Sequence, residues 1–274
     1  MTRPRMPRMR RGTGLAVGLV IVAVFLVAAG AAPLLAPSDP LAQDIPNALQ
    51  PPGAAHWLGT DDLGRDVLSR LLYGARLDLL IGLGAAAAAL LVGGAIGLLS
   101  GSLRGPADVA LTRVMDVFQV TPGIVLVVML LVVLGSSTGG MILALLAASW
   151  VAYARLVRAG ALRESQRDYV LAARLAGLGH ARILIRHVLP NVWLQAVVYA
   201  TSDAVLAIGT VASLGYLGIG IAAPTPEWGA MIAAGQPYLQ RAPWLVLVPG
   251  LTLTLLGLGL ALVSDGITAR RSRA

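Results

Sequence analysis

The chain has 274 residues, of which 57% are hydrophobic and 12% charged, and its formal net charge is +8. With a mean hydropathy of +0.79, it is too apolar and too poor in charge for a soluble domain of this length. It contains no cysteine, which excludes disulfides, zinc-thiolate sites, iron–sulfur clusters and thiol nucleophiles. The composition predicts an integral membrane protein.

Six segments are apolar enough to cross a bilayer, each near the length of about 20 residues that a helical span needs. They are residues 14–36, 77–100, 114–134, 139–160, 192–221 and 243–264. The first is long and has no Ala-x-Ala cleavage pattern close behind it, so we interpret it as a retained anchor rather than a signal peptide. The segments predict an all-α membrane protein with six transmembrane helices.

The distribution of arginine predicts the orientation of these helices. With the N-terminus inside, seventeen of the 21 arginines are cytoplasmic and four lie outside. This bias favours a topology with both termini in the cytoplasm. The chain then divides into a cytoplasmic basic tail (1–13), a first span (14–36), an extracytoplasmic loop (37–76), a membrane core (77–264) and a cytoplasmic tail (265–274).

The extracytoplasmic loop ends in a charged stretch after His56. Asp61, Asp62, Arg65 and Asp66 either contact a charged partner or pair internally as a cap that orients the loop. The cap is the favoured interpretation, because exposed ion pairs contribute little by themselves. Three acids near one histidine, without any cysteine, suggest a metal site only weakly.

Two glycine-containing patterns lie in the next spans. Gly93, Gly97 and Gly101 are spaced by four and predict close packing of helices, within the chain or against a partner. The run from Gly135 to Gly139 matches the nucleophile elbow of serine hydrolases. Of the three histidines only His56 shares its side of the membrane in this topology, so a short outer turn is favoured over a hydrolase.

Residues 155–190 form an arginine-rich interruption that cannot cross a bilayer. Ser165 and Asp168 resemble a capping box, which predicts a helix starting near Gln166. Tyr169, Ala172, Ala173 and Ala176 then follow at i, i+3, i+4 and i+7 and form one small-residue face.

Glycines are expected to end this helix at Gly177 and Gly179. A second short helix is expected from about His180 to Leu189, and Pro190 predicts a sharp turn into the fifth span. A basic segment that holds anionic lipid, at about 1 kcal/mol for each arginine, would explain the arginines but not the alanine face or the glycine break. The pattern is therefore typical of a docking surface.

Asp203 lies within the fifth span, where an ionisable residue costs about 2.5–3.5 kcal/mol on insertion scales. Such a residue faces a pathway or a partner, or else it is hydrated near the surface or bonded to Tyr199 or Thr201 of its own helix. Both interpretations stay open at this point.

The interruption resembles a known loop. Leu171-Ala172-Ala173, Gly177 and the ending from His187 to Asn191 are similar to the "EAA" loop of membrane subunits of binding-protein-dependent ABC importers, in the dipeptide, oligopeptide and nickel branch. The outer-loop motif resembles this branch at Gly59, Thr60, Asp61, Gly64, Arg65, Asp66, Arg70 and Arg76. The stretch from Leu217 to Gly220 and the run Pro224-Thr225-Pro226-Glu227-Trp228-Gly229 also resemble it.

The resemblance implies a permease subunit with a cytoplasmic coupling-helix loop, residues 161–190, between helices 4 and 5. The coupling residues would be Tyr169, Ala172, Ala173, Ala176, Gly177, His187, Leu189 and Pro190. The implied partners are a second homologous permease, two ABC ATPases that bind ATP and magnesium, an extracytoplasmic substrate-binding protein and a di- or oligopeptide. The expected location is the bacterial inner membrane, with no nucleic acid bound.

The chain itself is expected to be non-catalytic and free of cofactors. It has no lysine and therefore no Gly-x-x-x-x-Gly-Lys phosphate loop. Leu171 stands where the family motif has an acid, and Val211, Ala261 and Thr268 depart from the usual glutamate, asparagine and arginine. If the outer-loop charges contact a partner, that partner would be the binding protein or the charged ends of a peptide.

Two alternatives to a peptide permease remain. The same architecture could import nickel or another small solute. A stand-alone secondary transporter belongs to a different class and needs intramembrane acids in matching positions of two halves, for which Asp203 is the only candidate.

Overall fold

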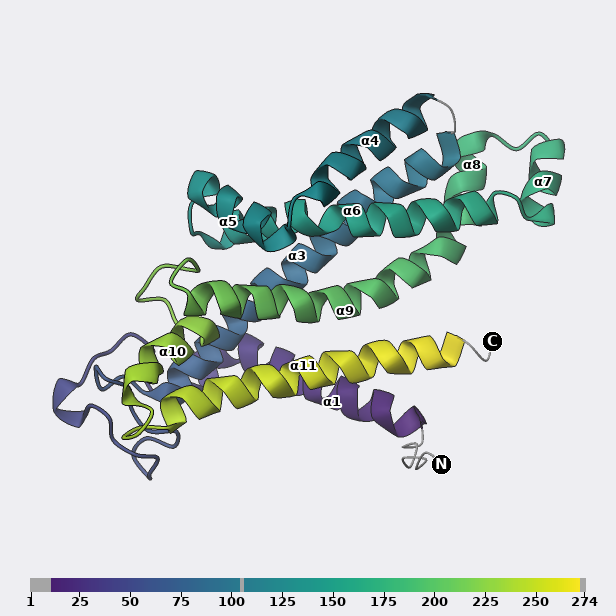
Figure 1. Cartoon of the computed structure of the whole chain (residues 1–274). Helices are drawn as coiled ribbons and strands as arrows, with labels where there is room; N and C mark the ends of the chain where they lie inside the picture. Colours follow the sequence, from purple (N-terminus) through teal and green to yellow (C-terminus); the bar gives the residue numbers. More distant parts are fainter. Residues whose placement is uncertain (1–10, 104–105, 272–274) are drawn as a thin grey trace, which may run out of the picture. The chain divides into compact units, whose positions relative to one another are not determined.

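The computed structural model describes residues 11–103 and 106–271 (Figure 1). Within these ranges the chain folds into helices and loops, and the only strand-like pairing is an isolated bridge between Thr60 and Asp66. The prediction of an all-α protein is thus confirmed for this part of the chain. Most of the predicted basic tail, with Arg3, Arg5, Arg8 and Arg10, lies outside the described residues.

Five stretches of helix are long and apolar enough to cross a membrane alone. They contain α1 (Arg11–Gly30), α3 (Val67–Leu103), α6 (Thr138–Glu164), α9 (Leu189–Tyr216) and α11 (Trp244–Arg271). A pair of shorter helices, α4 (Pro106–Val120) and α5 (Gly123–Leu134), passes the same test together. The six predicted spans are all present if this pair counts as one.

The third predicted span, residues 114–134, is not one straight helix. The axes of α4 and α5 differ by 90° across a break of two residues, Thr121 and Pro122. Pro122 has extended backbone angles (φ −56°, ψ 126°) and caps α5 from outside the helix. A proline lacks the N–H that would continue the helix and disfavours helical geometry in the residue before it. The break therefore occurs where the sequence places this proline.

Several helices extend beyond the predicted boundaries. α3 begins at Val67, inside the predicted loop 37–76, because Oδ2 of Asp66 accepts the backbone N–H of Ser69 at 2.8 Å and caps the helix. α11 continues to Arg271, through most of the predicted tail 265–274. Apolar length alone does not predict helix ends, since capping side chains and polar last turns lie outside the apolar run.

The chain divides into two compact units. The first unit contains α1, the outer loop, the start of α3 as far as Leu83, the end of α9 from Ala204, and α10 (Trp228–Gly235) with α11. α1 lies along α11 (Figure 1). Glycine permits this approach: a Cβ on Gly18 would lie 2.7 Å from the backbone oxygen of Gly259.

Short elements complete the first unit. The outer loop contains α2 (Ala32–Leu35) and the 3-10 turn η1 (Ile45–Asn47), and a second 3-10 turn, η3 (Gln236–Tyr238), follows α10. α10 packs against α11.

The second unit contains the rest of α3, α4, α5, most of α6, and the segment up to Asp203. A Cβ on Gly93 or Gly97 would lie 2.2 Å from the backbone oxygen of Trp150 or Ala154 in α6, and one on Gly101 would lie 2.9 Å from that of Arg158. The predicted glycine stripe therefore serves helix packing within the chain, between α3 and α6.

Ion pairs join α4 to α6 in the second unit. Nε and Nη2 of Arg158 donate to the two carboxylate oxygens of Asp108 at 2.7 and 2.6 Å. Nη2 of Arg155 donates to Oδ1 of Asp116 at 2.7 Å. The hydrophilic interruption thus starts later than predicted, because these arginines belong to α6, which continues to Glu164.

Candidate functional site

A short helix follows α6 where the sequence predicts the docking loop. α7 spans Asp168–Leu175, its N-cap is Arg167, and no side chain caps its first turn. The predicted capping box of Ser165 and Asp168 is therefore wrong. The backbone N–H of Ser165 donates to the oxygen of Ala161 at 2.9 Å, so Ser165 completes the last turn of α6 and lies too far ahead of α7 to cap it.

One side of α7 packs into the core of its own chain. Val170 and Ala173 are buried in a cluster with Ile183, Val188 and Val192. An eight-residue helix is not stable alone, so this burial is what holds α7 in place. Ala173, which the sequence assigns to the small-residue docking face, contributes to the internal core instead.

The opposite side of α7 exposes several apolar side chains. Leu171 and Leu175, one turn apart, are 43% and 90% exposed, and Ala172 and Ala176 beside them are also exposed. We call these four residues the α7 ridge. Leu175 is not among the predicted docking residues, although its i, i+4 spacing from Leu171 is visible in the sequence. Apolar side chains gathered on a polar loop indicate a surface that another molecule covers.

A hydrogen-bond network ties the start of α7 to both neighbouring helices. The Tyr169 hydroxyl lies 2.5 Å from Oε1 of Glu164, at the end of α6, and 3.1 Å from the backbone oxygen of His187. Nδ2 of Asn191, in the first turn of α9, donates to that hydroxyl at 2.9 Å and to the same backbone oxygen at 2.8 Å. Burial and the hydrogen bond to Glu164 raise the pKa of Tyr169 to about 12, so it stays a neutral hydroxyl.

Gly177 ends α7 through its backbone conformation. Its φ is +81°, in the left-handed region that favours glycine, and no atom lies within 4 Å of where a Cβ would be. The N–H of Gly177 donates to Arg174, and that of Leu178 donates to Ala173 at 3.1 Å, which closes the end of the helix. The prediction that α7 ends here is confirmed.

Pro190 does not produce the predicted sharp turn. α8 (His180–Ile183), a π-helical turn (Leu184–Val188) and α9 follow one another without a break, and Pro190 is the second residue of α9. The prediction of a turn is wrong because the wider π-helical turn just before the proline leaves room for its ring. Leu189 and Pro190 are therefore part of the helical run that connects α7 to the membrane segment.

The first part of the outer-loop motif forms an internally paired cluster. Oδ1 of Asp61 accepts the N–H of Arg65 at 2.9 Å, and Oδ2 of Asp61 accepts from Nε of Arg65 at 2.7 Å. Nε of Arg70 lies 3.4 Å from the same Oδ2. All three side chains are buried. This arrangement is the internal cap that the sequence analysis favoured.

The rest of the motif shapes the loop around this cluster. Nδ1 of His56 lies 3.0 Å from Oδ1 of Asp66. Gly64 has a φ of +74°, and a Cβ there would collide with the backbone of Asp44. The Thr60 hydroxyl donates to a backbone oxygen, whereas Arg76 is exposed. Within residues 11–103 and 106–271, no group of three or more His, Cys, Asp or Glu side chains could hold a metal.

Asp203 is buried in α9 and bonded to α6. Its Oδ2 accepts from the Tyr153 hydroxyl at 2.9 Å, and its Oδ1 lies 3.5 Å from Oγ of Ser149. The Tyr153 ring also packs edge-on against Tyr199, with 4.9 Å between the ring centroids. These partners come from the neighbouring helix and not from the Asp203 helix itself. A role for Asp203 in a pathway stays a prediction.

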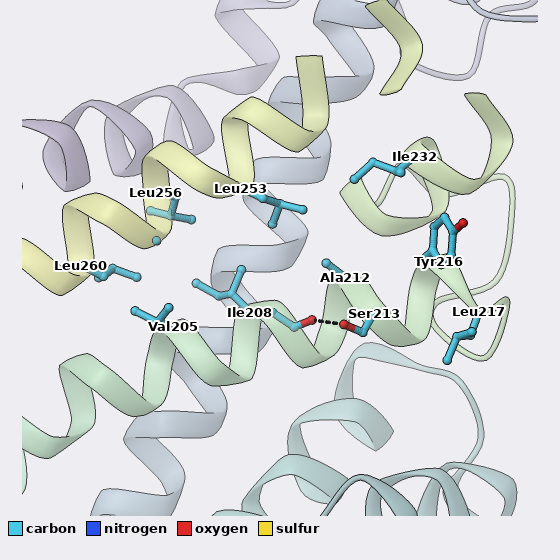
Figure 2. A pocket seen from close by; sticks show the side chains of 12 residues that line it. Val205, Ile208, Ala212, Ser213, Tyr216, Leu217, Ile232, Leu253, Leu256 and Leu260 are labelled. Atoms are coloured by element: carbon cyan, nitrogen blue, oxygen red, sulfur yellow. Dashed lines mark hydrogen bonds between the residues drawn. The ribbon is translucent and has the colours of Figure 1, made fainter. Parts of the chain in front are cut away.

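A cavity of about 510 Å³ lies among α9, α10 and α11 in the first unit (Figure 2). Its twelve lining residues are all uncharged, and two hydroxyls among them are already bonded. Ser213 donates to the backbone oxygen of Gly209 at 2.7 Å, and Tyr216 donates to Oε1 of Gln236 at 3.0 Å. The cavity fits an apolar group and offers nothing to a charged one.

The sequence matches known families over most of its length. Residues 93–273 match the family described as binding-protein-dependent transport system inner membrane component. Residues 7–52 match the N-terminal TM domain of oligopeptide transport permease C. The first match includes α7 and the segment up to Pro190, and the second includes α1 and part of the outer loop.

Similar proteins match this chain along most of their length and have related names. The di/tripeptide transport system permease protein of Pseudomonas aeruginosa is 42% identical over 91% of this chain and 84% of its own length. The dipeptide transport system permease protein of Alkalihalophilus pseudofirmus is 38% identical over 92% of this chain and 83% of its own. The oligopeptide transport system permease protein of Bacillus subtilis is 36% identical over 92% and 82%.

A solved structure shows the same fold at lower identity. A chain of the MetNI methionine ABC transporter, in an inward-facing conformation, superposes with a TM-score of 0.59 at 19% identity and covers 75% of this chain. At that identity the likeness concerns the fold alone. Taken with the sequence matches, it leads to one conclusion: the chain belongs to the family of binding-protein-dependent transport system inner membrane components and is the membrane-spanning permease subunit of an ABC importer.

Proposed function

We propose that this permease subunit imports di- or oligopeptides across the inner membrane of a bacterium. The observation that carries the proposal is the 42% identity, over 91% of the chain, to a di/tripeptide transport system permease protein. Relatives named for dipeptides and oligopeptides align over similar lengths, which supports peptide as the substrate class.

The complete importer would contain a second, homologous permease, two ABC ATPases and an extracytoplasmic binding protein. The family description itself names a binding-protein-dependent system. Because this chain has no lysine, it cannot form a Gly-x-x-x-x-Gly-Lys loop, and ATP with its magnesium must bind to other subunits. Both termini and α7 would be cytoplasmic, which the arginine distribution supports.

The α7 ridge is the proposed contact with the ATPase. Leu171 and Leu175 are exposed on one side of a helix whose other side is fixed in the core by Val170 and Ala173. An apolar contact here would replace the acidic one that Leu171 removes from the family motif. Apolar residues in the ATPase groove would therefore face this ridge.

Movement of α7 would pass directly to α6 and α9. Tyr169 bonds to Glu164 at the end of α6, and Asn191 at the start of α9 bonds to Tyr169. Closure of the ATPases on ATP would displace α7 and, through these bonds, both helices together. This is the rigid-body kind of transition by which packed helices switch between two states.

Transport by an intact system tests the substrate. A strain that lacks the gene for this chain should lose uptake of a radiolabelled dipeptide or of a labelled longer peptide and regain it on complementation, with the other subunits present. Loss of nickel uptake with normal peptide uptake would replace peptide by a metal ion. Uptake by the purified chain alone in liposomes, driven by an ion gradient without ATPases, would contradict the assembly.

A further inference from the structure

Two carboxyl groups meet at the N-terminus of α10 in the first unit. Asp78 comes from α3 and Glu227 is the N-cap of α10, and both residues are 0% exposed. They are far apart in the sequence and belong to different helices. Neither residue has a part in the proposed coupling. Glu227 belongs to a run that resembles the family, but the resemblance assigns it no role.

Backbone donors account for three of the four carboxyl oxygens. The N–H of Trp228 donates to Oδ2 of Asp78 at 3.1 Å. Those of Gly229 and Ala230 donate to Oε1 and Oε2 of Glu227, each at 2.7 Å. The fourth oxygen, Oδ1 of Asp78, is buried and has no hydrogen-bond partner among the described residues. A buried carboxylate oxygen without a donor is strongly unfavourable.

The surroundings of the pair are tightly packed. From α9, Gly215 faces Glu227 so closely that a Cβ there would collide with its carboxyl group. From α1, Phe25 packs edge-on against Trp228, with ring centroids 6.1 Å apart. Among the described residues, the only charged group that acts on Asp78 is Glu227.

Two ionised carboxylates are not compatible with this site. The N-terminal end of a helix provides roughly half a positive charge, which stabilises one carboxylate but not two. Like charges held together in a dry site cannot both ionise, and one of the pair then keeps its proton. Glu227 already accepts two strong backbone hydrogen bonds, which stabilise its charged form. Asp78, with its unpartnered oxygen, is therefore the better place for a proton.

We propose that Asp78 and Glu227 form a proton-binding site that holds one proton at neutral pH, carried on Oδ1 of Asp78. The proton removes one of the two buried charges and thereby keeps α10 packed on α3. Burial raises the pKa of Glu227 to about 7 despite its two backbone hydrogen bonds, which supports a site with room for only one negative charge.

A proton fits this site better than a metal ion. Only one carboxyl oxygen is free, whereas calcium takes six to eight oxygen ligands and magnesium takes six in near-octahedral geometry. The three backbone N–H groups that point at the pair would also repel a cation. One unpartnered oxygen beside a second carboxyl group is suited to a single proton.

The site should make stability depend on pH. The stability that the shared proton provides is fully present at acidic pH and is lost as the pH rises and the second carboxyl group of the pair ionises. The unfolding midpoint of the full-length chain, purified with the subunits that accompany it, should therefore fall by several degrees between pH 5 and pH 9.

Infrared spectroscopy and three variants test the assignment. At pH 7 the wild-type complex should show the C=O band of a protonated carboxyl group, and Asp78→Asn should lose that band. Asparagine is the neutral equivalent of protonated aspartic acid, so Asp78→Asn should also keep the wild-type unfolding midpoint at pH 5 and lose most of its fall toward pH 9. Glu227→Gln should lower the midpoint at every pH, because its NH₂ faces a backbone donor. Asp203→Asn is the control for another buried carboxyl and should leave the Asp78 band in place.

Other results would overturn the proposal. A band that survives Asp78→Asn but disappears in Glu227→Gln would place the proton on the other residue. Failure of Asp78→Asn to fold would show that the neutral form is not the native one. A higher midpoint at pH 9 on addition of calcium or sodium would identify a cation site. Peptide transport is not among the measurements, so the outcome is independent of the proposed function.

Discussion

The Tyr153 hydroxyl in α6 donates a 2.9 Å hydrogen bond to Oδ2 of Asp203 in α9. α6 precedes the docking segment and α9 follows it. Tyr169, which lies in that segment, joins the two helices a second time through its hydrogen bonds to Glu164 and Asn191. α6 and α9 are thus connected at two levels in the second unit, and a displacement of one cannot leave the other behind without breaking these hydrogen bonds.

Replacing Tyr153 by Phe should destabilise the protein by about 1–3 kcal/mol, because the buried Asp203 carboxyl loses its shorter hydrogen bond. The unfolding midpoint of the purified complex measures this. Tyr199→Phe removes a hydroxyl from the same aromatic pair but leaves the Tyr153–Asp203 hydrogen bond in place, so it should cost less. Equal effects of the two variants would mean that the Asp203 bond contributes nothing specific.

Leu175→Glu should release the ATPase subunits during purification while the permease still inserts in the membrane. Leu175 is 90% exposed, so the charge costs little in the folded chain but is desolvated at an apolar interface. Ile45→Glu, at a 65% exposed position in the outer loop, is the matched control and should retain the ATPases. If Leu175→Glu keeps its ATPases and its peptide-stimulated ATP hydrolysis, α7 does not dock through this ridge.

Gly177→Ala should destabilise the end of α7 by about 1 kcal/mol, since its φ of +81° is unfavourable for any residue with a Cβ. Gly179→Ala is the control, because its φ is −64° and a Cβ there meets no atom within 4 Å. Hydrogen exchange of the α7 amides should be faster in the first variant and unchanged in the second. Faster exchange in both would point to a general need for flexibility.

Gly97→Ala should reduce the amount of folded protein in the membrane, whereas Gly94→Ala should be tolerated. A Cβ on Gly97 would lie 2.2 Å from the backbone oxygen of Ala154, which cannot move without displacing α6. A Cβ on Gly94 meets only the ring of Trp193, at 3.5 Å. Yield and unfolding midpoint measure the difference, and similar values for the pair would contradict close packing of α3 on α6.

The sequence predicted the membrane helices because apolar length is a local property. It also predicted that Gly177 ends α7, since a glycine at a helix end has a limited choice of conformations. Pro122 was equally visible, but membrane helices tolerate proline, so apolarity alone could not reveal the 90° bend between α4 and α5.

Features that depend on distant residues were not predictable in the same way. Which side of α7 is buried depends on Ile183, Val188 and Val192, so the local pattern predicted an exposed Ala173 and did not single out Leu175. The pairing of Asp78 with Glu227 has no local pattern at all, because it arises only when α10 packs against α3.

The exposed Leu175 also bears on how the importer is made in the cell. A permease that is synthesised without enough ATPase would carry this leucine uncovered on its cytoplasmic side, if α7 lies there as proposed. Chaperones and proteases recognise such uncovered apolar residues in unassembled proteins. The abundance of the permease would then follow that of its ATPase, and excess copies would be degraded before they reach the assembled transporter.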